Sequence, residues 1–154
     1  WQDSRLAGAF GQLMLRLIET YGDGRVHWFL ISKGYRTYRF LPVFFNRFFP
    51  VFSVPTPPES QRLLDVVAST RFGPAYDPAS GLVRFGGRHD RLRPGMNDIP
   101  ERVGRDPHVR FFLQRNPGYA IGDELACVAD IAHSNLNDRA RRVIARTSVT
   151  WQEC

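Results

Sequence analysis

The residues near the start of the chain could bind an anion. Arg5, Gly8 and Gly11 lie in the stretch RLAGAFGQLMLRLIET, which ends at Thr20. A glycine-containing turn that opens a helix exposes backbone N–H groups with no partner in the helix, at the positive end of the helix dipole. Arg5 adds a positive charge, so the stretch meets the physical requirements for binding a phosphate. Many helix starts meet these requirements, and the alternative is that the two glycines only allow the helix to pack closely.

Basic residues are abundant, and almost all are arginine. The 154 residues include 21 lysines and arginines against 15 acidic residues, a formal net charge of +6, and Lys33 is the only lysine. Arginine forms bidentate contacts with phosphate and carboxylate groups, which would suit an anion-binding surface. However, the arginines are spread along the whole chain, whereas a nucleic-acid footprint should cluster. We therefore favour a GC-rich genome as their origin, and nucleic acid is a partner that the composition allows but does not favour.

The bulk composition predicts a folded domain with a real core, because 43% of the residues are hydrophobic and 13% are aromatic. The chain begins at Trp1, not Met, and reaches a helix pattern almost at once, so we expect a fragment or a processed chain. Cys127 lies in an apolar run and is expected in the core, and neither it nor Cys154 indicates a metal site or a disulfide. We find no signal peptide and no membrane-spanning run, and expect a cytoplasmic protein.

The first half of the sequence predicts a helix, a strand and a second helix. The expected apolar face of the first helix comprises Phe10, Leu13, Met14, Leu17, Ile18 and Tyr21. After a glycine turn, the stretch RVHWFLIS from Arg25 to Ser32 is typical of a buried strand, in which His27 is expected to be a satisfied core group. Aromatic and aliphatic residues then recur at helical spacing from Tyr35 to Phe48, and Pro42 must kink or restart that helix.

This order belongs to an α/β or α+β layer fold, for which we expect a mixed sheet with helices packed on both faces. Thr56 and Glu59 predict a capping box, followed by a helix that buries Leu63, Leu64, Val66 and Val67. The remaining expected elements are a short strand near Leu82–Phe85, a helix starting at Asp106-Pro107 and ended by Asn116-Pro117-Gly118, a strand over Glu124–Ile131, and a final helix within 134–147 capped by Ser134 or Asn135.

Three polar clusters could carry further chemistry. The loop RFGGRHDRLRPG, from Arg84 to Gly95, includes His89 and Asp90 and could bind phosphate or gate a substrate, although we favour a solvated surface loop. Around the last strand lie Asp123, Glu124 and Asp130. Glu124 could bind an amine substrate if the strand lines a cleft, whereas neighbouring strand residues point to opposite faces and form poor acid–base pairs. The third cluster is the basic face of the final helix, Arg139, Arg142 and Arg146, which we expect to be solvated.

The element order resembles the second half of the GNAT superfamily of acyl-CoA-dependent N-acyltransferases. In that family, a Gln/Arg-x-x-Gly-x-Gly/Ala turn at a helix start holds the pyrophosphate of coenzyme A through backbone N–H groups. The matching residues here are Arg5-Leu6-Ala7-Gly8-Ala9-Phe10. Phe10 stands where the family has Gly or Ala, and Gly11 would allow a shifted register. The resemblance covers Arg5 to Phe49, and the early strands of the family would lie upstream.

The resemblance implies direct transfer of an acyl group from acetyl-CoA or another acyl-CoA to an amine, without a metal. It implies that Arg5 and the N–H groups of Gly8, Ala9, Phe10 and Gly11 hold the cofactor. Tyr38, or less favourably Tyr35, would protonate the departing thiolate, which a phenol with a pKa near 10 can do. Residues 1–54 would form the coenzyme-A-binding unit, and residues 55–154 an additional α+β region packed on the same domain.

The alternative is a non-catalytic binding module for nucleic acid or a protein partner. Arginines interleave with the aromatic residues between Tyr35 and Phe49, and such a surface could stack on unpaired bases. An argument against a binding module is that aromatic residues at helical spacing are more often part of a core. The sequence indicates neither an acceptor amine nor an oligomeric state.

Overall fold

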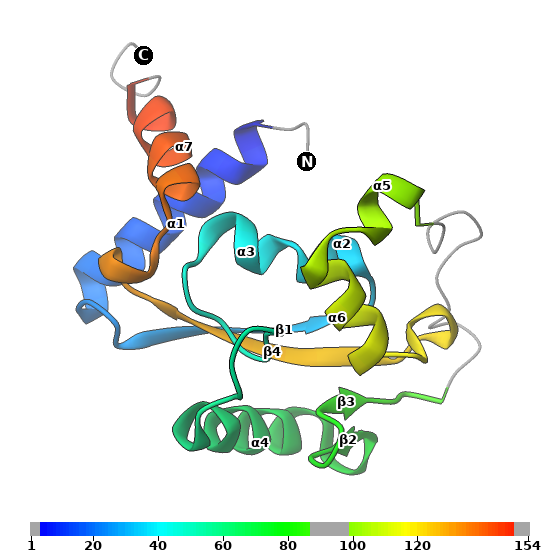
Figure 1. Ribbon diagram of the computed structural model, residues 1–154. Coiled ribbons are helices and arrows are strands. Elements are labelled where there is room, and N and C mark those ends of the chain that lie inside the picture. The colour runs from blue at the N-terminus through cyan, green and yellow to red at the C-terminus, as the bar shows by residue number, and fades with distance from the viewer. Residues whose placement is uncertain (1–3, 87–98, 150–154) are drawn as a thin grey trace. The chain divides into compact units, whose positions relative to one another are not determined.

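The protein has an α+β fold, as the sequence predicts. The computed structural model describes residues 4–86 and 99–149. Along the chain the elements are α1 (Ser4–Tyr21), β1 (Val26–Ser32), α2 (Tyr35–Tyr38), α3 (Phe40–Phe44), α4 (Pro58–Phe72), η1 (Gly73–Ala75), β2 (Tyr76–Asp77), β3 (Leu82–Val83), α5 (Glu101–Gly104), α6 (Pro107–Arg115), η3 (Tyr119–Ile121), β4 (Glu124–Ile131), η4 (His133–Asn135) and α7 (Asp138–Val149) (Figure 1).

Within the described ranges the strands form one four-stranded sheet in the order β1-β4-β3-β2. The pairs β2–β3 and β3–β4 are antiparallel. His27 contacts Asp130 near one end of β1, and Lys33 contacts Glu124 just beyond its other end, so β1 and β4 also run in opposite directions. The sheet is therefore antiparallel, where we expected a mixed one. The short strand expected near Leu82–Phe85 is β3, whereas β2 was not predicted, because two residues are too few to show a period.

The described residues divide into two compact units, which we treat separately. Unit 1 comprises the described residues up to Trp28, Pro42–Arg47, and the described residues from Ala129 on. Unit 2 comprises Phe29–Leu41 and Phe48–Val128. Both of the expected regions, 1–54 and 55–154, contribute to both units.

The core of unit 1 forms where α1 packs against α7 and against aromatic rings. Met14 and Ile18 of α1 are buried, whereas Leu13 and Tyr21 of the expected apolar face are 49% and 61% exposed. The ring of Phe10 lies 4.6 Å from that of Trp28 and 5.0 Å from that of Phe44. The buried face of α1 is thus narrower than the spacing of its apolar residues predicts, because only part of that face contacts other elements of unit 1.

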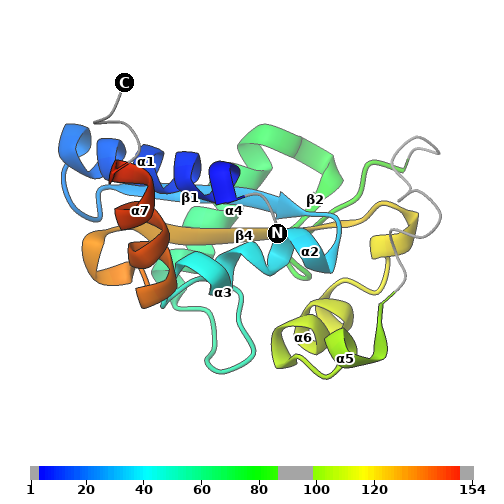
Figure 2. The same cartoon turned by 90° about the horizontal axis from the view of Figure 1, so that it is seen from above.

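In unit 2, helices cover both faces of the sheet, as predicted. Leu64 and Ala68 of α4 pack on Val83 and Val128 on one face, and α2 and α6 lie on the opposite face (Figures 1 and 2). Val66 was expected to be buried, but it is 60% exposed because it lies on the outer side of α4.

Local signals set several helix ends. Asp106 caps α6, accepting a hydrogen bond from the backbone N–H of His108 at 2.9 Å, as predicted. Pro42 lies in the first turn of α3, where its missing N–H breaks no helical bond, so it restarts the helix. The capping box at Thr56 does not form, because Pro57 occupies the N-cap position of α4. Asn137 caps α7 by accepting from the N–H of Ala140 at 2.9 Å, in place of Ser134 or Asn135.

Candidate functional site

The residues expected to hold a pyrophosphate lie inside α1. The helix begins at Ser4, so Arg5 is in its first turn and residues 8–11 lie beyond that turn. In an α-helix each N–H from the fifth residue on donates to the carbonyl four residues earlier. The N–H groups of residues 8–11 are therefore used within the helix. The N–H groups that lack helical partners are those at the start of a helix, so the expected site would lie earlier in α1 than residues 8–11.

The surroundings of Gly8 and Gly11 indicate that both glycines lie where α1 packs against other residues. Gly8 is buried and Ala9 is exposed. Gly11 faces Ile144 of α7 so closely that a Cβ at this position would overlap Ile144 Cγ1 and lie 3.3 Å from Cδ1. For Gly11, the alternative that the glycine allows close packing of the helix is confirmed.

The two candidate catalytic tyrosines are buried in unit 2. Tyr38 is 0% exposed, and its hydroxyl donates a hydrogen bond of 2.7 Å to the carbonyl of Pro50. Burial raises the pKa of Tyr38 far above the usual value for a phenol. Tyr35 is 4% exposed, and its hydroxyl accepts a hydrogen bond of 3.3 Å from Nε of Arg36. In this arrangement Tyr38 supports the core and its proton is engaged, so it is not placed to protonate a thiolate.

We expect Tyr38→Phe to lower the free energy of unfolding by about 1–2 kcal/mol, because it leaves the buried Pro50 carbonyl without its donor. Chemical denaturation measures this change, and Tyr35→Phe, which removes only a long contact to Arg36, is the control with a smaller effect. Any acyl-transfer rate should be unchanged in Tyr38→Phe. A rate lowered by about 10²-fold or more would mean that the hydroxyl does act as a general acid.

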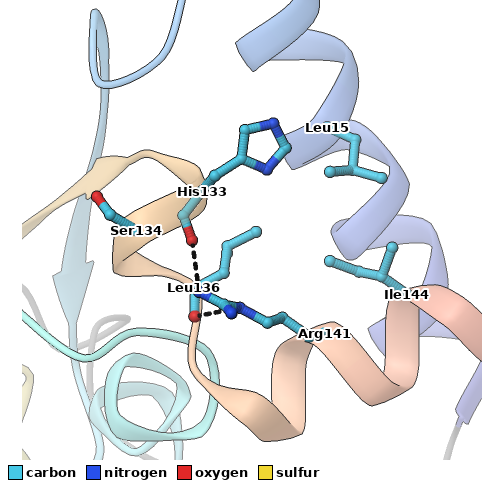
Figure 3. Close-up of a pocket in the computed structure, with 6 residues that line it drawn as sticks. All are labelled: Leu15, His133, Ser134, Leu136, Arg141 and Ile144. Carbon is cyan, nitrogen blue, oxygen red and sulfur yellow. Dashed lines mark hydrogen bonds between the residues drawn. The ribbon is translucent and has the colours of Figure 1, made fainter.

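A pocket of ≈ 390 Å³ opens on the surface of unit 1, between α1, η4 and α7 (Figure 3). Its lining residues are Leu15, His133, Ser134, Leu136, Arg141 and Ile144. The His133 ring lies on the side of Leu15, whereas the Ser134 hydroxyl points away from that ring, so the two do not form a nucleophile–base pair (Figure 3).

Backbone contacts fix the polar side of this pocket. Arg141 donates from Nε to the carbonyl of Leu136 and from Nη2 to the carbonyl of His133, both at 3.0 Å. The backbone N–H of His133 donates to Oδ1 of Asp23 at 2.7 Å. Sequence reasoning missed this site, since neither His133 nor Arg141 belongs to a recognisable motif. The one feature of the sequence that pointed to this pocket was that His133 and Arg141 lie close together in the chain, on either side of the start of α7.

The structure changes the interpretation of His27 and Glu124. His27 is exposed, and its Nδ1 lies 2.8 Å from Oδ1 of Asp130, so it is not the core group that we expected. Glu124 is 8% exposed and lies 3.2 Å from Nζ of Lys33. The amine that Glu124 binds is thus the chain's own lysine.

The other candidate residues have structural partners or lie outside the described ranges. Arg84 pairs with Asp77 at 3.2 Å and with Asp123 at 3.4 Å. The rest of the Arg84–Gly95 cluster from position 87 on, with His89 and Asp90, lies outside the described residues.

Of the two cysteines, only Cys127 lies within the described residues. Burial raises the pKa of Cys127 to about 12, which makes it an unreactive core thiol, and Cys154 lies outside the described residues. In residues 4–86 and 99–149, no group of three or more His, Cys, Asp or Glu side chains could hold a metal ion.

Comparisons with protein-family models, with curated proteins and with solved structures gave no match. The fold and the site therefore define the class only as an α+β protein with a small polar–apolar pocket. Over the described part of the chain, no helix combines the length and apolar character needed to cross a bilayer.

Proposed function

We propose that the chain is an N-acyltransferase that transfers an acyl group from an acyl-CoA directly to an amine, with residues 1–54 as its coenzyme-A-binding unit. The observation that carries the proposal is the order of α1, a glycine turn, the apolar strand β1 and the tyrosine-bearing helix α2. This order is the feature by which the chain resembles the second half of the GNAT superfamily.

In this proposal the pyrophosphate binds at the first turn of α1. Residues 4–7 form the first described turn of α1, and the N–H groups at a helix start lack helical partners and lie at the positive end of the dipole. Arg5 belongs to the same turn and adds a cation. Gly11 then serves the packing of α1 on α7, and the leaving thiolate takes its proton from a group other than the buried Tyr38.

A thermal-shift titration with acetyl-CoA tests this site. A ligand at about 100 times its Kd stabilises the folded state by ~2.7 kcal/mol, which raises Tm by about 5–11 °C for a chain of this size. Arg5→Gln should lose most of the shift. Arg16→Gln removes the same charge from an exposed position later in α1 and should keep the shift. An unchanged Tm in the parent, or equal shifts in the two variants, would overturn the proposal.

The second candidate is a non-catalytic binding module, favoured by the exposed Arg139, Arg142 and Arg146 of α7. The aromatic run gives it less support than expected, because Tyr35, Tyr38, Phe44, Phe45 and Phe48 are all buried. If acetyl-CoA has no effect, binding to RNA and DNA should be measured as a function of salt. Affinity that falls steeply with salt would indicate phosphate contacts by these arginines.

A further inference from the structure

The pocket of unit 1 combines an apolar wall with a positively charged edge. Leu15, Leu136 and Ile144 provide the wall. Leu136 and Ile144 are only 2% and 7% exposed, so they form the floor of the pocket, and the half-buried Leu15 is the more accessible apolar residue. The volume of ≈ 390 Å³ falls within the range of about 300–1,000 Å³ that is usual for small-molecule sites.

Arg141 is oriented in advance at the edge of this wall. Its guanidinium has five N–H groups, of which two donate to the carbonyls of Leu136 and His133. The other three have no partner among the described residues and can bind an anion. A guanidinium held in one orientation suits the planar, bidentate geometry of a carboxylate.

The surroundings of Arg141 favour an anion over a cation. His133 lines the same pocket, and none of the lining residues is acidic. The carboxylate of Asp23 contacts η4, where it accepts a hydrogen bond from the backbone N–H of His133.

We propose that this pocket binds a small organic carboxylate with an apolar body, of the kind found in medium-chain fatty acids. The carboxylate pairs with Arg141, and the hydrocarbon chain lies on Leu15, Leu136 and Ile144. This site is separate from the first turn of α1, because Arg5 and Leu15 are about 15 Å apart along the helix axis. It does not depend on the proposed acyltransferase activity.

An NMR titration of the whole chain with octanoate tests the proposal, with the backbone amides of His133, Leu136 and Arg141 as the readout. We expect saturable shifts at these amides. Hexanoate should bind more weakly, by up to roughly 15-fold, because each fully buried methylene contributes a factor of about four. Octanol, which lacks the carboxylate, should bind roughly tenfold or more weakly. The absence of saturable shifts, or equal binding of octanol and octanoate, would overturn the proposal.

Two matched pairs of variants locate the ligand. Arg141→Gln should weaken octanoate binding roughly tenfold or more. Arg142→Gln should leave it unchanged, because Arg142 donates to the carbonyl of Asp138 in the same helix but does not line the pocket.

If Arg141→Gln fails to fold, the pair Leu15→Ala and Leu13→Ala tests whether the ligand binds in this pocket. Leu15→Ala should reduce the preference for octanoate over hexanoate, whereas Leu13→Ala, at an exposed position outside the lining, should not. Equal effects within either pair would contradict the assignment.

Discussion

Replacing Asn135 with alanine is expected to lower the free energy of unfolding by about 3–5 kcal/mol. Asn135 is 0% exposed. Its Nδ2 donates to the carbonyls of Arg47 at 2.9 Å and Asp130 at 2.8 Å. Its Oδ1 accepts from the N–H of Arg47 at 2.7 Å. Alanine would leave all three backbone groups without these partners, and each unsatisfied group costs about 1–3 kcal/mol.

Chemical denaturation of Asn135→Ala beside Asn46→Ala measures this effect. Asn46 is the matched control, because it is exposed and its side chain makes only long contacts, 3.4 Å to the carbonyl of Ser134 and 3.5 Å to that of Leu136. We expect a change of less than about 0.5 kcal/mol for Asn46→Ala. Equal denaturation midpoints for the two variants would show that the network around Asn135 contributes little.

Gly11→Ala is expected to destabilise the protein by about 2 kcal/mol, although alanine normally stabilises a helix interior by roughly 1 kcal/mol relative to glycine. The reason is the contact with Ile144, whose Cγ1 would overlap the new Cβ. Isoleucine has one strongly preferred χ1 rotamer in a helix, and Ile144 is buried, so it cannot easily move aside. The two helices would have to separate.

A double-mutant cycle with Ile144→Ala isolates this clash. In the Ile144→Ala background the space is free, so Gly11→Ala should stabilise by roughly 1 kcal/mol, and the sign of the effect reverses. Gly104→Ala, at the end of α5, controls for adding a Cβ where there is room, since the nearest side-chain atom is 3.8 Å from the position of that Cβ. Destabilisation in both backgrounds would show that the cost has a cause other than the contact with Ile144, and stabilisation in both would show that the clash is absent.

The sequence alone determined the elements whose signals are local. The apolar run from Glu124 to Ile131 is β4, and the strand expected within Arg25–Ser32 is β1. Asp106-Pro107 starts α6, since the cap and the proline act on the turn that they begin. Such elements were predictable because the residues that decide them are neighbours in the chain.

The candidate site was predictable only in part. The sequence identified Arg5 at a helix start, but it could not show that Ile144 fills the space beside Gly11 or that the Tyr38 hydroxyl meets the Pro50 carbonyl. The periodicity of apolar residues indicates which face of a helix or strand a residue occupies, but it does not indicate which other elements cover that face. Leu13 and Met14 illustrate this, since both were assigned to one apolar face and only Met14 is buried.

Tertiary structure alone decided the partners of the polar residues and the existence of the pocket. Asn135 could cap a helix or bond to a distant backbone, and the proximity of Arg47 selects the second role. The pairing of His27 with Asp130 depends on strand register, and a slip of one residue would turn one of the two side chains to the other face. Leu15 and Arg141 line one pocket only because α1 packs against α7, and no local pattern encodes a contact between segments so far apart in the chain.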